Sequence, residues 1–173
     1  MEIDYKRNQP KIEKTIIDIL NDKKDKVINK IKNLTKQEFS KIEAKANGNC
    51  MFYAILKSIK ENEIKHMEMR QIVPDYITQI NYDNEEAIFR EEKCRTKYEY
   101  ANKLRKNGAY ANDIALEAIA KMTNFLIGIY KSDERYKQNP WTIIDTSNDE
   151  YKGIILLHFN QGYPKGTGHY SGI

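Results

Sequence analysis

The stretch ANGNCMFYAI, residues 46–55, places one of the chain's two cysteines between a tight Asn-Gly-Asn turn and an apolar run. The apolar residues after Cys50 recur at helical spacing and predict a helix that begins at the cysteine; they are Met51, Phe52, Ile55, Leu56 and Ile59. A thiol becomes a good nucleophile as a thiolate, and the dipole of a helix N-terminus favours that charge. Cys50 is therefore either a candidate nucleophile or a core residue at a helix start.

The turn before Cys50 matters for the same chemistry. An Asn-Gly-Asn turn leaves backbone N–H groups near the sulfur, and such donors can hold the oxyanion of an acyl-transfer intermediate. A nucleophilic cysteine also needs a base, and that histidine is adjacent in space rather than in sequence.

Three histidines are candidates for the base. We expect His66 to be exposed at a helix start, and His158 to be structural because it lies inside the apolar run ILLHFN. His169 follows the glycine-rich segment GYPKGTG and begins a short terminal strand. A glycine loop lets a substrate backbone approach closely while the strand fixes the imidazole, so His169 is the best base by position.

Composition sets the class of protein. The chain has 173 residues, of which 31% are charged and 40% hydrophobic, as expected for one soluble globular domain. No apolar run approaches the ~20 residues that cross a bilayer, and the opening MEIDYKRNQP lacks the apolar stretch of a secretory signal. Two cysteines, Cys50 and Cys94, cannot form a disulfide framework, so we expect free thiols and a cytoplasmic location.

The net charge of +4 lies in the N-terminal part of the chain. Residues 1–41 hold 11 Lys or Arg against 7 Asp or Glu, and the remainder holds 18 of each. Apolar periodicity in this part indicates one or two amphipathic helices. We therefore predict a basic helical N-terminal arm over 1–41 and a separate domain over 42–173. The small surplus is more typical of a solvated lysine-rich helix face than of a nucleic-acid-binding protein.

The rest of the chain predicts helices that precede and flank a small sheet. HMEMRQIVPDYITQI is helical in pattern, and its Pro74 either kinks the helix or starts a new one. A helix with Asn112 as its cap is followed by the strand-like runs FLIGIY, WTIID and IILLHF and by the terminal strand. Three to five short strands with flanking helices predict an α/β or α+β layered domain.

Three segments together resemble the ovarian tumour (OTU) family of cysteine deubiquitinases. NGNCMFYAI resembles that family's Asp-Gly-Asn-Cys-Leu-Phe-x-Ala-Ile signature, and GTGHYSGI resembles its closing Gly-x-His-Tyr strand. Between them, GAYANDIALEAIAKMTNFLIGIY is similar to the family's middle motif. The three occur in the family's order and cover residues 42–173.

The resemblance implies a papain-like OTU fold and a cysteine protease domain over 42–173. It implies hydrolysis of the bond after the C-terminal glycine of ubiquitin, with Cys50 as nucleophile and His169 as base and acid. The oxyanion donors would be the backbone N–H groups around Gly48, Asn49 and Cys50. It implies ubiquitin, polyubiquitin or ubiquitin-like modifiers as partners. We further expect a monomer with no cofactor and no metal.

Two positions depart from the family pattern. Asn47 stands where the signature usually has Asp, and its amide can still help the oxyanion hole or orient the histidine ring. Ser171 stands where many members have Asp or Asn to orient the ring. A serine oxygen can accept the Nδ1–H less strongly than a carboxylate. Ser171 is thus either a weak third member or an ordinary strand hydroxyl, and a slow or inactive enzyme is the further alternative.

Substrate contacts are also predicted. Gly166 and Gly168 precede His169, where a substrate backbone would approach. One or more of the acidic residues of the segment YDNEEAIFREE would face the basic tail of ubiquitin, with Glu85 and Glu86 as the first candidates; the others are Asp83, Glu91 and Glu92. A catalytically weak or inactive ubiquitin-binding module is the rival function, which the presence of both Cys50 and His169 disfavours. Cys94, between charged residues, has no expected role.

The remaining classes are disfavoured by the sequence. A metal site lacks C-x-x-C or H-x-x-x-H spacing, and a phosphate loop lacks its Gly-Lys-Ser/Thr ending. Heavy use of Ile, Lys and Asn suggests an AT-rich genome, as in a virus, an intracellular bacterium or a parasite, in which case the ubiquitin and the cytoplasm would be the host's.

Overall fold

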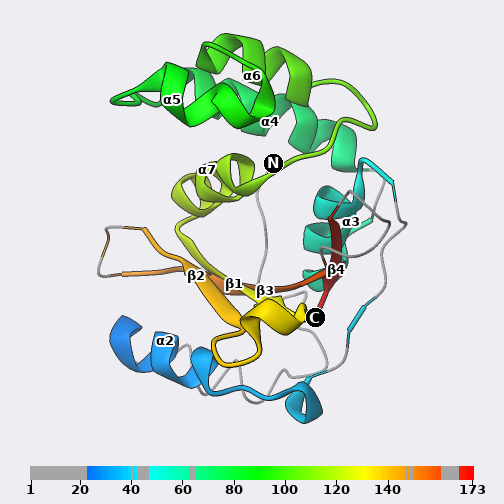
Figure 1. Ribbon diagram of the computed structural model, residues 1–173, viewed down its shortest axis with the longest axis vertical. Helices are drawn as coiled ribbons and strands as arrows, with labels where there is room; N and C mark the ends of the chain where they lie inside the picture. The colour runs from blue at the N-terminus through cyan, green and yellow to red at the C-terminus, as the bar shows by residue number, and fades with distance from the viewer. Residues whose placement is uncertain are drawn as a thin grey trace.

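The computed structural model describes residues 23–39, 41–42, 47–62, 65–146, 148, 150–160 and 168–173. Its helices are α2 (Lys24–Lys32), η1 (Lys36–Glu38), α3 (Cys50–Ser58), α4 (His66–Gln79), α5 (Glu85–Phe89), η3 (Arg90–Glu92), α6 (Lys97–Leu104), α7 (Asp113–Thr123) and η4 (Glu134–Tyr136). Its strands are β1 (Phe125–Lys131), β2 (Trp141–Ile144), β3 (Gly153–Asn160) and β4 (His169–Gly172). The predicted mixed α/β fold, with a small sheet flanked by helices, is confirmed (Figure 1).

The sheet is mixed and has the strand order β2-β1-β3-β4. β1 and β3 are parallel, and β2 and β4 add to them antiparallel on either side. Residues of β1 and β3 are buried almost without interruption because α7 and α3 cover one face of the sheet and α2 covers the other (Figure 1). This explains why both strands read as continuous apolar runs rather than as alternating ones.

The helices begin where the sequence predicts. α3 starts at Cys50, and the side chain of Asn112 caps α7 by accepting the Ile114 N–H at 3.2 Å. α4 runs from His66 to Gln79 with Pro74 inside it, so the chain neither breaks nor restarts there. The cost of the missing N–H is offset by tertiary packing, since Pro74 is buried.

The described part of the N-terminal arm packs on the sheet. Val27 and Ile31 of α2 belong to the hydrophobic core, and the Lys24 ammonium lies 2.6 Å from the Asp145 carboxylate. The Trp141 indole N–H donates to Leu34 O at 3.0 Å. Residues 1–22, and thus any first helix of the arm, lie outside the described residues.

The contact between α3 and β4 positions the site. A Cβ on Gly172 of β4 would lie only 2.7 Å from the Ser58 Oγ of α3, so the strand and the helix can approach this closely only with glycine there. The Ile173 N–H donates to the same Ser58 Oγ at 3.3 Å. The Cys50 helix is therefore fixed against the strand that His169 begins. Within the described residues, no helix has the length and apolar character needed to span a membrane.

Candidate active site

Cys50 is the first residue of α3 and is 2% exposed. Burial raises the pKa of its thiol, while the backbone N–H groups of Tyr170, Met51 and Cys50 itself oppose that rise by stabilising the thiolate. Tyr170 follows His169 in β4, so the histidine's own strand donates a hydrogen bond at the sulfur. In this environment the thiol stays protonated at neutral pH unless a base removes its proton.

His169 is buried at the start of β4 and lies directly opposite Asn160 of β3 in the sheet register. Ser171, two residues further along β4, is fully buried, and the described residues offer its Oγ no hydrogen-bond partner. The Ser171 hydroxyl therefore makes no hydrogen bond to the His169 ring in this arrangement. Side chains opposite one another on antiparallel strands have Cβ atoms about 5 Å apart, so Asn160 and His169 are cross-strand neighbours.

The turn before the nucleophile is closed by Asn47. Its exposed side chain accepts the Asn49 N–H at 2.9 Å, and its backbone carbonyl accepts the Cys50 N–H at 3.0 Å. Asn47 thus shapes the turn, and two of the N–H groups predicted for the oxyanion hole already have acceptors within it.

Gly48 permits the closest backbone approach in the site. A Cβ at this position would lie 1.5 Å from the carbonyl oxygen of Gly108, in the loop that follows α6. No side chain fits between these two backbone segments, so the NGN turn needs glycine for this close packing.

Arg70 of α4 is a site residue that the sequence pattern does not reveal. Its side chain is fully buried, and its guanidinium donates to the side-chain oxygen of Asn49 from Nε at 3.1 Å and from Nη2 at 2.6 Å. A charged residue within an amphipathic helix ordinarily indicates an exposed face. Nothing local in HMEMRQI distinguishes this arginine.

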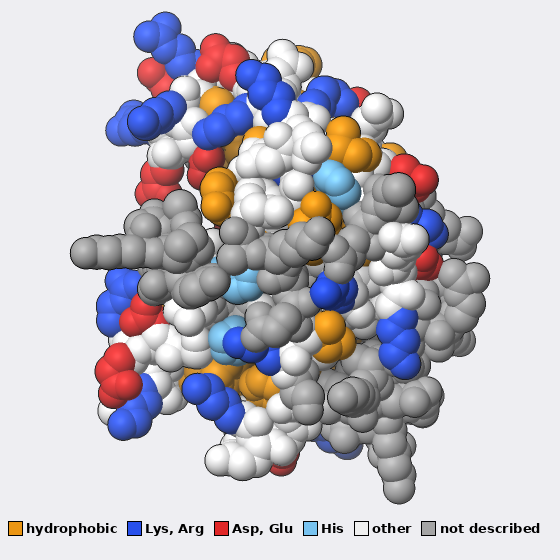
Figure 2. Space-filling model, turned by 90° about the vertical axis from the view of Figure 1, so that its right-hand side faces the viewer, with side chains coloured by type: hydrophobic (Ala, Val, Ile, Leu, Met, Phe, Trp, Pro, Cys, Tyr) orange, Lys and Arg blue, Asp and Glu red, His pale blue; other side chains and the backbone are white. Residues whose placement is uncertain are grey.

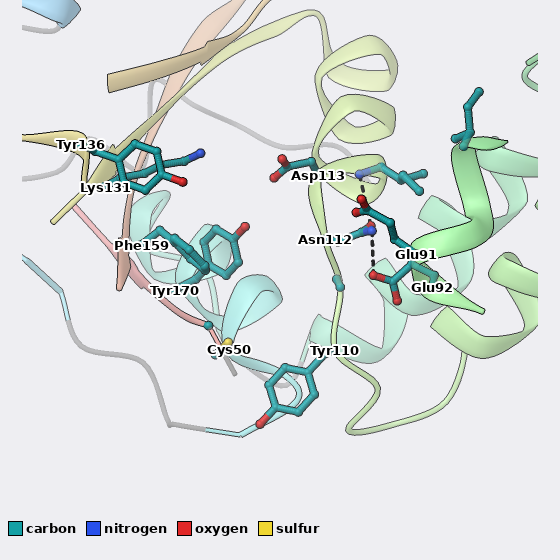
Figure 3. A pocket seen from close by; sticks show the side chains of 14 residues that line it. Cys50, Glu91, Glu92, Tyr110, Asn112, Asp113, Lys131, Tyr136, Phe159 and Tyr170 are labelled. Carbon is teal, nitrogen blue, oxygen red and sulfur yellow. Dashed lines mark hydrogen bonds between the residues drawn. The ribbon is translucent and has the colours of Figure 1, made fainter. Parts of the chain in front are cut away.

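A pocket of about 500 Å³ opens beside Cys50. Figure 3 shows the sulfur at one end, Tyr110 next to it, Phe159 and Tyr170 along one wall, and the Asp113 carboxylate directed into the space.

Some of the residues that the sequence predicts to contact substrate line this pocket, and others do not. Its other acidic lining residues are Glu91 and Glu92, and Gly168 also lines it. Glu85 and Glu86, on the first turn of α5, are not among the described residues that line it, and Gly166 lies outside the described residues.

The remaining histidines and the second cysteine lie elsewhere. The expectation that His66 is exposed is wrong: it is buried, with its ring 5.1 Å from the Tyr53 ring. His158 stacks on Tyr130, in keeping with a structural role. Cys94 is buried and its thiol donates to Glu92 O at 3.4 Å. Among the described residues, no three His, Cys, Asp or Glu side chains form a group that could hold a metal ion.

This arrangement can support thiol acyl transfer. A cysteine starts a helix, a histidine starts the neighbouring strand, and the backbone N–H groups of Tyr170, Met51 and Cys50 lie at the sulfur. The pocket next to them carries carboxylates, which favours an extended, positively charged segment of substrate.

Comparisons with known proteins agree with this arrangement. The family model of OTU-like cysteine proteases matches residues 45–170. No curated protein sequence matches the chain significantly. Among solved structures, the OTU domain of OTUD1 is 19% identical with a TM-score of 0.58, covering 84% of this chain and 92% of that one.

Two microbial structures have the same fold. The viral OTU domain protease from Dera Ghazi Khan virus is 14% identical with a TM-score of 0.56, covering 78% of this chain and 79% of the other. An OTU deubiquitinase from Wolbachia pipientis wMel, solved bound to ubiquitin, is 13% identical with a TM-score of 0.57, covering 77% of this chain and 93% of the other.

Proposed function

We propose that this chain, which belongs to the OTU-like cysteine protease family, is a deubiquitinase that hydrolyses peptide or isopeptide bonds after the C-terminal glycine of ubiquitin. The observation that carries the proposal is the placing of Cys50 at the start of α3, with its sulfur facing the N–H of the residue after His169. The ubiquitin-bound Wolbachia relative supports the choice of substrate.

The chemistry follows from two side chains. His169 takes the proton of the Cys50 thiol, and the thiolate forms a bond to the carbonyl carbon of ubiquitin's last glycine. The proposed oxyanion donors are the backbone N–H groups around Gly48, Asn49 and Cys50. Those of Asn49 and Cys50 now bond to Asn47, and they exchange that acceptor for the oxyanion as it forms. The C–N bond then breaks, and the leaving lysine amine takes the proton from His169. Water, deprotonated by His169, cleaves the thioester and returns the thiol and a free carboxylate.

Three polar residues are candidates for orienting the His169 ring. Ser171 is buried without a hydrogen-bond partner among the described residues, and Asn47 is committed to the turn. Asn160 lies opposite His169 in the sheet and offers an amide oxygen. We propose Asn160 as the principal orienting group and Ser171 as a minor one.

The acidic pocket is the proposed path for the ubiquitin tail. Asp113, Glu91 and Glu92 line it together with Cys50. A basic, extended tail entering between α7 and η3 would bring its positive charges to these carboxylates and its terminal glycine to the sulfur. Gly168 lies where the tail backbone would pass His169, and we expect Gly166 to extend that contact.

We also propose a division of the chain into a protease domain and an N-terminal arm. We propose 42–173 as the protease domain, with 1–41 as an arm whose helix α2 covers the far face of the sheet. The arm carries none of the proposed catalytic groups. The frequent use of Ile, Lys and Asn, which suggests an AT-rich genome, supports a virus or intracellular microbe as the source and host ubiquitin as the substrate.

The test is reaction with ubiquitin that carries a C-terminal electrophile. We expect a covalent adduct on Cys50, seen by intact mass and peptide mapping, and none on Cys94. Cys50→Ala should abolish the adduct, and His169→Ala should abolish cleavage of ubiquitin chains while His158→Ala does not. Labelling that survives Cys50→Ala would overturn the assignment, and binding of ubiquitin without any reaction would identify the inactive binding module instead.

A further inference from the structure

We propose that Arg70 is a positioning residue that fixes the orientation of the Gly48–Asn49 peptide, and thereby of the turn that presents the nucleophile and the oxyanion-stabilising N–H groups. The expected effect of Arg70 on catalysis rests on the proposed function. Its effect on the orientation of the Gly48–Asn49 peptide can be tested without ubiquitin.

The contacts of Arg70 tie three segments together. Besides its two bonds to the Asn49 side chain, the guanidinium donates to Gly48 O at 3.2 Å, to Ala109 O at 2.8 Å and, from Nη1, to Leu104 O at 2.7 Å. One side chain from α4 thus links the end of α6 and the loop after it to the turn before Cys50.

All of these acceptors are uncharged oxygens. Burying a guanidinium without a carboxylate is costly, and the hydrogen bonds must offset that cost. Two features of the surroundings help: Leu104 is the last residue of α6, where the helix dipole favours a cation, and the Phe52 ring lies 4.8 Å from the guanidinium carbon. An apolar residue would cost less free energy to bury here. The contribution of Arg70 is therefore the geometry of its hydrogen bonds.

That geometry decides which way one peptide faces. In a trans peptide the C=O and the N–H point in opposite directions. Because Arg70 holds Gly48 O in the interior, the Asn49 N–H of the same peptide must point outward, where Asn47 Oδ1 accepts it at 2.9 Å. The peptide is clamped from both sides, and it lies directly before the nucleophile.

The Asn49 side chain completes the clamp. Its oxygen also accepts the Gly108 N–H at 2.9 Å, and its Nδ2 donates to Asn107 Oδ1 at 2.9 Å. The turn and the loop at 107–109 are therefore held as one unit, in agreement with the contact between Gly48 and Gly108 that leaves no room for a Cβ. Without Arg70, the peptide before Cys50 loses the bond that prevents it from turning over.

The test compares Arg70→Met with Arg105→Met in the full chain. Arg105 is the matched control because it also joins α4 and α6, through an ion pair with Asp75 at 2.6 Å, and it makes no contact with the turn. We expect amide hydrogen exchange of the segment 47–53 to be at least about tenfold faster in Arg70→Met than in wild type, and unchanged in Arg105→Met.

Catalysis gives the second readout. On a ubiquitin substrate with a fluorogenic C-terminal amide, kcat should fall by about a hundredfold in Arg70→Met with KM within about twofold, as expected for a misplaced oxyanion site. Alkylation of Cys50 by iodoacetamide should keep the wild-type rate, since this reaction forms no oxyanion. Arg70→Lys, which keeps the charge without the planar fork, should recover only part of kcat.

Several results would overturn the proposal. The first is that the exchange rate of residues 47–53 and kcat change no more in Arg70→Met than in Arg105→Met. The second is that kcat and the rate of Cys50 alkylation fall equally, which would mean that Arg70 supports the fold or the thiol and not the oxyanion site. If Arg70→Met does not fold, Asn107→Ala is the second variant, because Asn107 is exposed and bonds to the Asn49 side chain. Amide exchange of residues 47–53 should be faster in Asn107→Ala than in wild type, and an unchanged exchange rate would contradict the clamp. If the wild-type protein neither binds nor cleaves ubiquitin, only the proposed function is refuted. The hydrogen-exchange comparison of Arg70→Met with Arg105→Met would still decide the role of Arg70.

Discussion

At the scale of single residues, burial of Cys50, the proposed nucleophile, governs the chemistry expected of the site. Cys50 has its thiol pKa raised by burial, and nearby backbone N–H groups only partly offset this. A catalytic cysteine in this setting depends on its histidine to become a thiolate near neutral pH.

The pH dependence of alkylation tests this dependence. In His169→Ala the rate of Cys50 alkylation should rise with pH through a midpoint above the ~8.5 of a free thiol, because burial disfavours the thiolate. The wild type should react faster at pH 7. Peptide mass spectrometry separates Cys50 from Cys94, and a midpoint below 8.5 in His169→Ala would mean that the backbone N–H groups outweigh burial.

The polar residues around the pair have separable roles. Ser171→Ala should reduce kcat/KM only modestly, because its hydroxyl makes no hydrogen bond to a described residue, and Asn160→Ala should reduce it more. Asn47→Ala should lower it on the order of a hundredfold by releasing the turn, while Asn47→Asp, which keeps the acceptor, should stay near wild type.

Kinetics on the fluorogenic ubiquitin substrate measures all four variants. If Ser171→Ala is as inactive as Cys50→Ala while Asn160→Ala and Asn47→Ala are near normal, Ser171 is the third member of the triad.

At the scale of elements, α2 stabilises the sheet from the face opposite the nucleophile. Ile31 is buried in the core, and its side chain lies so close to Gly128 of β1 that a Cβ there would be 3.2 Å away. This packing belongs to stability and not to chemistry.

Truncating the Ile31 side chain should separate the contribution of α2 to stability from any contribution to catalysis. Ile31→Ala should lower the free energy of unfolding by about 3 kcal/mol, the usual cost of a large buried side chain reduced to alanine. Urea unfolding measures the loss, and the exposed change Lys32→Ala is the control. At a temperature where both variants are folded, their kcat should match that of the wild type; a selective loss of kcat in Ile31→Ala would place α2 in the catalytic machinery.

At the scale of the whole molecule, buried tyrosines set an alkaline limit on stability. Burial raises the pKa of Tyr82 to about 12, and it raises the pKa values of Tyr100 and Tyr170 further. The Tyr100 hydroxyl also donates to Asn112 at 2.6 Å, a bond that requires its proton.

The sign of the effect follows from linkage. A tyrosine with a raised pKa stays protonated in the folded protein while the unfolded chain loses its proton near pH 10, so the stabilisation is complete below pH 10 and declines as the pH rises toward 12. Urea unfolding between pH 8 and pH 11.5 should show falling stability above pH 10. Tyr100→Phe should flatten that decline, and an unchanged slope in this variant would exclude Tyr100 as a contributor.

The helix that begins at Cys50, the Asn112 cap, the four strands and the family were predictable from the sequence, because turn residues, caps and apolar periodicity act over a few neighbouring positions. The sequence also indicated Cys50 and His169. Local patterns could not reveal that Arg70 is buried against the turn before Cys50, that the Tyr53 ring packs on His66, or that Asn160 lies opposite His169 in the sheet. Among the acidic residues that the sequence suggests as substrate contacts, the structure places Glu91 and Glu92 in the pocket lining at Cys50, and it adds Asp113 from a distant segment. These facts depend on which distant segments meet, since strand register and helix packing are set by the sum of many long-range contacts that no local pattern encodes.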